Sequence, residues 1–253
     1  MVRTEEPRPI RLKDYRPPDW LIETVVLDVS IDPTATTVRS KLRLKPNGGA
    51  MPAPVVLDGE ELTLRSVSLD GKPLPADAFM ATPETLTIAQ PPNHPFTLEI
   101  ETAIDPAANT RLMGLYRADS TYCTQCEAEG FRRITYFLDR PDVMAVYTTR
   151  IEADKKEAPV LLANGNLTAK GDVPGTNRHF AVWHDPFKKP CYLFALVAGE
   201  ASTYLSLKML RPLFSMAPIL KAETATIMKI SRSYSRPNAS SSQRMARLRL
   251  SMA

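Results

Sequence analysis

The stretch VVLDVSIDPTATTVRSKLRL, residues 25–44, decides the fold because its apolar residues recur with a period of two on both sides of a turn. The turn is the pair Asp32-Pro33, and the alternating apolar residues are Leu27, Val29, Ile31, Val38, Leu42 and Leu44. A period of two places these side chains on one face of an extended chain. The stretch therefore predicts a hairpin of two antiparallel strands with one buried face.

Short runs with the same period follow one another from Trp20 to Gly199, separated by residues that favour turns. The pairs Asp70-Gly71 and Asn164-Gly165 are such turns. The further strands that this pattern predicts are residues 62–69, 85–88, 96–101, 144–153, 160–163, 179–183 and 192–198. One short helical turn is predicted at residues 140–145, where Pro141 suits a first helical position. Residues 1–200 are therefore predicted to form an all-β, antiparallel domain.

Residues 201–253 differ abruptly in composition from the first 200 residues. They carry nine Lys or Arg and one acidic residue, a net charge of +8, whereas residues 1–200 sum to −4. They contain no Gly, and Pro212, Pro218 and Pro237 would interrupt any long helix. We therefore expect a separate, irregular or partly helical tail at 201–253. Two interpretations fit it: a shifted reading frame, or a basic arm that binds nucleic acid or a partner protein, although few aromatic residues are present for base stacking.

The start of the chain and the cysteines bear on the cellular compartment. The first 20 residues are charged and rich in proline, without the apolar core of a secretory signal. No apolar run reaches the roughly 18 residues that a membrane-spanning helix needs. Three cysteines, an odd number, argue for free thiols in a reducing compartment. The sequence therefore predicts a cytoplasmic protein without a membrane partner.

The histidines do not form the motif of a zinc peptidase. That motif, His-Glu-x-x-His on a helix, needs two imidazoles on one face and a carboxylate that activates water. The chain has three histidines, His94, His179 and His184, and none is followed by Glu. Serine-nucleophile and phosphate-loop patterns are also missing. No catalytic residue is therefore predicted in this chain.

The pair Cys123-x-x-Cys126 is a candidate for metal binding or redox chemistry, and Cys191 and His184 could complete a set of four ligands. A second Cys-x-x-Cys, or a Cys-x-x-His at ligand spacing, is absent from the sequence. We therefore favour structural cysteines and expect neither a metal site nor a cofactor.

The segment CTQCEAEGFRR, residues 123–133, carries alternating acceptors at Gln125, Glu127 and Glu129. An extended backbone would point all three side chains to one side. Carboxylate and amide oxygens suit the three N–H donors of a peptide's α-ammonium group, which is cationic at neutral pH. Spacing alone favours the simpler alternative, a solvated polar strand face. The segment is therefore a candidate site whose role the spacing leaves open.

Four stretches resemble the bacterial aminopeptidase N branch of the M1 family of zinc aminopeptidases. They are GLYR at 114–117, CTQCEAEGFRRITYFLDRPDVMAVYTTRIEADK at 123–155, NGN at 164–166 and DPFKKPCYLFALVAGE at 185–200. The resemblance implies a saddle-like antiparallel β domain that packs against a thermolysin-like catalytic domain. It also implies that Gln125 and Glu127 bind the amine of a peptide substrate, and gives Cys123, Cys126 and Glu129 only structural or neighbouring roles.

The resemblance ends near Glu200, where the composition changes. The zinc-site and exopeptidase motifs that follow in the family are absent from this chain. We therefore expect an N-terminal substrate-anchoring domain that is inactive by itself, with zinc confined to the full-length family enzyme. Its expected partners are peptides with a free N-terminus, in the full-length enzyme, and a polypeptide that supplies the catalytic domain, whereas nucleic acid is less favoured.

Overall fold

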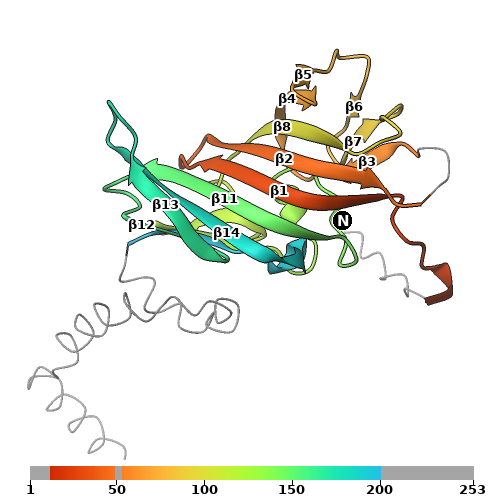
Figure 1. The fold of residues 1–253 in the computed structure, drawn as a ribbon. Helices are drawn as coiled ribbons and strands as arrows, with labels where there is room; N and C mark the ends of the chain where they lie inside the picture. Colours follow the sequence, from red (N-terminus) through yellow and green to blue (C-terminus); the bar gives the residue numbers. More distant parts are fainter. Residues whose placement is uncertain (1–11, 49–52, 201–253) are drawn as a thin grey trace, which may run out of the picture. The chain divides into compact units, whose positions relative to one another are not determined.

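The computed structural model describes residues 12–48 and 53–200, whose regular secondary structure is almost entirely β-strand (Figure 1). The tail predicted at residues 201–253 lies outside this described part. The described ranges also contain three short 3-10 helices: η1 (Leu12–Asp14) precedes the first strand, and η2 (Phe131–Arg133) and η3 (Cys191–Leu193) lie between later strands. The all-β prediction for the body of the chain is therefore confirmed. No helix in the described ranges has the length and hydropathy to cross a membrane.

The largest sheet has eight strands in the order β13-β14-β11-β1-β2-β8-β4-β5. In that order the strands are β13 (Asn166–Asp172), β14 (Arg178–Pro190), β11 (Met144–Asp154), β1 (Trp20–Ser30), β2 (Thr36–Pro46), β8 (Phe96–Ile104), β4 (Thr63–Leu69) and β5 (Lys72–Pro73). Neighbours are antiparallel except β1 and β11, which run parallel. The sequence pattern did not predict this exception, because periodicity does not reveal strand direction.

Two smaller sheets complete the described part. A four-stranded sheet has the order β12 (Val160–Ala163), β15 (Leu196–Gly199), β10 (Thr121–Gln125) and β9 (Gly114–Ala118). A three-stranded sheet has the order β3 (Val55–Asp58), β7 (Thr85–Ile88) and β6 (Met80–Ala81). The candidate segment at 123–133 therefore begins in the four-stranded sheet.

The hairpin predicted from residues 25–44 is formed by β1 and β2. Val29 pairs with Val38, and Val25 pairs with Leu42. The alternating apolar side chains of both strands are at most 2% exposed. The Asp32 carboxylate accepts hydrogen bonds from the backbone N–H groups at positions 34 and 35, which closes the turn. Burial of this apolar face stabilises the hairpin through the hydrophobic effect.

Two local predictions were wrong. The helical turn expected at residues 140–145 is not formed: Val143 N donates to Arg140 O at 3.3 Å in a simple turn, and the chain becomes extended where β11 begins at Met144. The strand expected at residues 192–198 is shorter than predicted. Its first part belongs to η3, where Phe194 N donates to Cys191 O at 3.0 Å, and only Leu196–Gly199 pairs as a strand.

The segment between β10 and β11 joins the sheets to one another. Thr135 Oγ1 lies 2.8 Å from Ser40 Oγ of β2, and Ile134 O accepts a hydrogen bond from Thr102 Oγ1 of β8. Phe137 exchanges two backbone hydrogen bonds with Asp58 of β3. The segment thus contacts both the large sheet and the three-stranded sheet.

The ring of Phe131, which is 0% exposed, is the centre of an aromatic cluster in the core. It makes edge contacts with Phe137 at 4.8 Å, Phe194 at 5.2 Å and Tyr147 at 6.1 Å between ring centroids. These rings come from the 126–143 connection, from the chain after η3 and from β11. Phe131, which lies inside the candidate segment at 123–133, is therefore fixed in the core.

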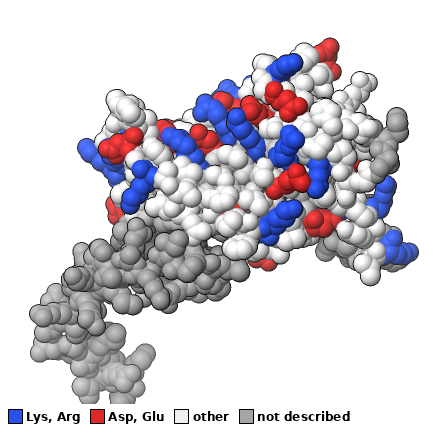
Figure 2. Space-filling model, viewed as in Figure 1, with Lys and Arg blue, Asp and Glu red and all other residues white. Residues whose placement is uncertain are grey.

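On strands β2 and β8, charged side chains alternate with the buried apolar ones. They form cross-strand pairs on the face of the large sheet opposite the core. Lys41 lies 2.8 Å from Glu99, and Arg39 lies 2.8 Å from Glu101. Figure 2 shows basic and acidic side chains interspersed on the visible surface, without a large area of one sign. Exposed pairs of this kind contribute about 0.2–1 kcal/mol each.

Candidate amine-binding turn

Gln125 ends strand β10, where it pairs with Gly114 of β9. Residues 126–130 follow as a turn that is closed by a hydrogen bond of 2.9 Å from Gly130 N to Cys126 O. The prediction that an extended backbone would align Gln125, Glu127 and Glu129 is therefore wrong. The backbone leaves the strand because Cys126 and Phe131 are both drawn into the core, at 2% and 0% exposure.

The polar side chains of the 126–130 turn nevertheless face solvent. Gln125, Glu127 and Glu129 are exposed, whereas Cys126 and Gly130 are buried. Gln125 Nε2 donates a hydrogen bond of 3.2 Å to the backbone carbonyl of Glu127. This bond orients the amide group and leaves its oxygen as an acceptor. The peptide bond between Glu127 and Ala128 is cis.

The two glutamates of the turn differ in their ion pairs. Glu129 Oε2 lies 3.5 Å from Arg132 Nη2. Glu127 has no cationic partner within 4.0 Å among the residues that the structure describes. Of the two glutamates of the turn, Glu127 is therefore the one without an ion-pair partner in the described ranges.

Asp139 supports the turn from the protein interior. Its side chain is 0% exposed, and Oδ2 accepts hydrogen bonds from Arg132 N at 3.1 Å and from Arg132 Nε at 3.0 Å. Its other oxygen accepts a bond of 3.0 Å from Cys191 Sγ. A buried carboxylate must be paired in this way to offset its desolvation. Asp139 thus ties the end of the turn to η3.

Arg133 fixes the other side of the same segment. Its side chain is 4% exposed and pairs with Glu60 at 2.5 Å and with Glu61. Its Nε also donates to Met113 O at 3.2 Å. The guanidinium thereby links η2 to the loop that follows β3 and to the start of β9.

Gly130 is required for space. Its backbone has φ −92° and ψ −13°, which any residue can adopt. A Cβ atom there would lie 2.4 Å from Gln125 O and 3.0 Å from Cys126 Cα. The turn therefore folds back tightly against the end of β10, and this contact sets the position of Gln125.

The outer edge of β9 is partly occupied. Asn109 Nδ2 donates hydrogen bonds to Met113 O at 2.8 Å and to Leu115 O at 2.9 Å. Arg117 N donates to Pro106 O at 2.9 Å. The loop before β9 thus satisfies backbone groups that an edge strand would otherwise present to solvent.

The cysteines do not form the alternative four-ligand site. Burial raises the pKa of the thiols of Cys123, Cys126 and Cys191, which favours neutral, weakly ligating sulfur. His184 lies on β14, where its Nδ1 is 2.9 Å from Thr148 Oγ1. Within residues 12–48 and 53–200, no group of three or more Cys, His, Asp or Glu side chains has an arrangement that could hold a metal ion.

The other histidines are also engaged locally. His179 Nε2 lies 2.7 Å from Ala158 O, and His94 Nδ1 lies 3.1 Å from the carbonyl of the next residue, Pro95. The three histidines of the described part are therefore not arranged to bind a zinc ion of the kind that the family resemblance implies for a full-length enzyme.

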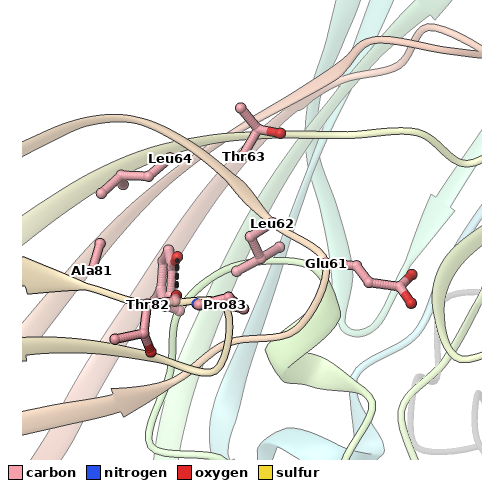
Figure 3. Close-up of a pocket in the computed structure, with 8 residues that line it drawn as sticks. Glu61, Leu62, Thr63, Leu64, Ala81, Thr82 and Pro83 are labelled. Atoms are coloured by element: carbon pink, nitrogen blue, oxygen red, sulfur yellow. Dashed lines mark hydrogen bonds between the residues drawn. The ribbon is translucent and has the colours of Figure 1, made fainter.

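A groove between β4 and the β6–β7 turn lies apart from the candidate residues (Figure 3). Its volume is about 520 Å³, and it is lined by Glu61, Leu62, Thr63, Leu64, Ala81, Thr82, Pro83 and Tyr136. Tyr136 OH donates a hydrogen bond of 3.5 Å to Thr82 O across one wall. Figure 3 shows Glu61 turned away from the other lining side chains. Neither Gln125 nor Glu127 lines this groove.

Sequence reasoning identified the exposed residues of the turn and missed those that hold it. Arg132, Arg133 and Asp139 were not singled out, and Gly130 was not recognised as a close contact. The Arg-Arg pair directly after the acidic turn was the available signal, since two cations beside exposed carboxylates indicate ion pairing. Asp139 gave no local signal, because its partners Arg132 and Cys191 lie seven and 52 residues away along an irregular chain.

Known proteins similar to this chain are aminopeptidases. Aminopeptidase N of Caulobacter vibrioides is 52% identical over 199 residues, which are 79% of this chain and 23% of that protein. Aminopeptidase N of Escherichia coli is 47% identical over 197 residues, covering 78% and 22%. The chain thus spans less than a quarter of the length of these relatives.

Solved structures show the same similarity. Legionella pneumophila aminopeptidase A in complex with aspartic acid superposes with a TM-score of 0.70 at 36% identity, over 76% of this chain and 22% of that one. The M1 zinc metallopeptidase of Deinococcus radiodurans has a TM-score of 0.61 at 16% identity, over 72% and 42%, which shows a common fold. The family model of the Peptidase M1 N-terminal domain matches residues 14–193. This chain therefore belongs to the Peptidase M1 N-terminal domain family.

Proposed function

We propose that this chain is a substrate-anchoring domain of an aminopeptidase N-like enzyme, in which Gln125 and Glu127 bind the α-ammonium group of a peptide. The observation that carries the proposal is the difference between the two glutamates of the turn. Glu129 is paired with Arg132, whereas Glu127 is exposed and has no ion-pair partner in the described part. A free carboxylate on a firmly held turn is suited to a cationic end group.

The chemistry of the two side chains fits an ammonium ligand. An α-amino group has a pKa of about 7.7–8.0 and is mostly cationic at neutral pH. Its three N–H donors can be shared between the Glu127 carboxylate and the Gln125 amide oxygen, and hydrogen bonds to a carboxylate are charge-assisted. The bond from Gln125 Nε2 to Glu127 O keeps the amide oriented before a ligand arrives.

Hydrolysis is not part of the function that we propose for the isolated chain. The family relatives include zinc metallopeptidases, but the histidines described above do not converge on a metal. In a full enzyme, a fixed amine site would set the distance between the peptide's end and the reacting bond, which contributes to orientation as well as affinity. We propose the cytoplasm as the location and a catalytic domain as the packing partner.

Binding of L-alaninamide, a minimal α-ammonium ligand, tests the proposal. Titration followed by NMR should shift the resonances of residues 125–130, and Glu127→Gln should abolish that shift. Glu84→Gln is the matched control, because Glu84 is also exposed and has no ion pair among the described residues. If Glu127→Gln binds L-alaninamide as tightly as the unmodified chain, the amine-binding role is wrong.

A second assay addresses catalysis. The purified chain should not hydrolyse L-alanine p-nitroanilide, with or without added zinc. Turnover that persists after contaminating peptidases are removed would refute the proposal that the chain is inactive alone.

A further inference from the structure

Arg132 contacts three carboxylates beside the 126–130 turn. Its Nε lies 3.0 Å from Asp139 Oδ2, and its Nη2 lies 3.5 Å from Glu129 Oε2 and 3.9 Å from Asp58 Oδ2. Nη2 also donates to the backbone carbonyl of Asp139 at 3.3 Å. The Arg132 guanidinium is therefore held by Asp139 on its buried side, and its Nη2 also faces Glu129 of the turn.

The groups behind Arg132 are themselves fixed. Asp139 is fully buried and also accepts the Cys191 thiol, and its backbone N–H donates to Asp58 Oδ2 at 3.1 Å. The Arg132 side chain is 21% exposed, whereas Glu129 is 68% exposed. Glu129 is thus the solvent-facing partner, and Arg132 is the anchored one.

This asymmetry determines how many free carboxylates the turn offers. Glu127 and Glu129 are two residues apart and both reach solvent. Two free carboxylates would suit a divalent cation such as Ca²⁺, which binds several oxygen ligands. One free carboxylate suits a single ammonium group.

We propose that Arg132 is a specificity-determining residue: by pairing with Glu129 it leaves Glu127 as the single free carboxylate of the turn and favours a monovalent ammonium over a divalent cation. The inference rests on the proposed function, in which Glu127 receives the ammonium. It adds a residue that touches no ligand and acts through the positive charge that it places beside Glu129.

The test is the ratio of two affinities, for Ca²⁺ and for L-alaninamide, measured on the full chain at low ionic strength. In Arg132→Gln, the ratio of Ca²⁺ to L-alaninamide affinity should rise roughly three- to tenfold, because the lost positive charge acts twice as strongly on a dication. Arg132→Lys keeps that charge and should leave the ratio near its original value. A merely structural role would lower both affinities in both variants without changing the ratio, and that result would overturn the inference.

A surface variant tests the same idea without touching the buried network. Glu129→Gln leaves Arg132 without its turn partner, so the ratio should fall roughly threefold. An unchanged ratio in Glu129→Gln would also overturn the inference, even if Arg132→Gln fails to fold. Arg39→Gln removes the same charge from an exposed pair on the large sheet and should leave the ratio unaltered.

The two proposals fail in different ways. If Glu127→Gln leaves L-alaninamide binding intact, the proposed amine site is wrong and the inference falls with it. If Glu127→Gln abolishes binding but Arg132→Gln leaves the ratio unchanged, only the role of Arg132 is wrong.

Discussion

Replacement of Gly130 by alanine tests whether close backbone contact holds the turn. The new Cβ would lie 2.4 Å from Gln125 O and 3.0 Å from Cys126 Cα, so backbone must move. The flexible end of Met113, also at 3.0 Å, can swing aside, but the backbone atoms cannot. Overpacking of this kind costs about 1–3 kcal/mol. For a domain of this size, each kcal/mol lowers the melting temperature by roughly 2–4 °C.

Gly71→Ala is the matched control. Gly71 has φ +77°, which strains alanine, but no atom lies within 4 Å of the position that a Cβ would take there. The conformational penalty is about 1 kcal/mol, partly offset by the reduced entropy of the unfolded chain. Gly71→Ala should therefore lower the melting temperature slightly and leave L-alaninamide binding unchanged.

The two variants should separate in both assays. Gly130→Ala should melt at a lower temperature than Gly71→Ala by calorimetry and should bind L-alaninamide more weakly, because Gln125 is displaced. The reasoning is refuted if Gly130→Ala melts at or above the temperature of Gly71→Ala. It is also refuted if Gly130→Ala binds the ligand with unchanged affinity while its stability drops.

Three other perturbations probe the core, the acid stability and the tail. Phe131→Ala removes a fully buried ring with three aromatic neighbours and should lower the free energy of unfolding by about 3–5 kcal/mol. The measurement is urea titration followed by tryptophan fluorescence. A loss below about 1 kcal/mol would contradict the packing. Burial raises the pKa of Glu152, but hydrogen bonds from Arg178 and Arg150 outweigh it and lower the pKa overall, so its stabilisation is present at neutral pH and is lost as the pH falls below about 4.5. Glu152→Gln should therefore reduce stability at pH 7 and flatten the decline in acid; an equally steep decline would argue against the pairing. Removal of residues 201–253 should abolish any retention on a nucleic-acid column, and retention by the shortened chain would exclude the basic tail as its cause.

The strands of the body were predictable because their burial has a period of two. The β1–β2 hairpin and the strands at 85–88 and 160–163 follow directly from that period and from turn residues. The pairing of β12 and β13 with different sheets did not follow, although Asn164-Gly165 lies between them. A turn pair reports a local change of direction, and sheet membership depends on contacts far along the chain.

The candidate turn shows the same limit. Exposed acceptors at Gln125 and Glu127 could be named from the sequence, but their alternation predicted a strand that the chain does not form. Burial of Cys126 and Phe131 sets the backbone conformation there. Because only one apolar residue stands on each side of the acidic turn, the sequence gives no periodic signal. Asp139 became visible only through its bonds to Arg132 and Cys191.

The occupied edge of β9 has a consequence for how a peptide can approach. Many peptide-binding domains capture their ligand as an additional strand, through backbone groups along an open sheet edge. An incoming strand at β9 would meet carbonyls at Met113 and Leu115 that are already bonded to Asn109. Addition of a peptide as a further strand on the outer edge of β9 is therefore disfavoured. Under the proposed function, binding of a peptide by its N-terminal end is the mode that remains compatible with this edge.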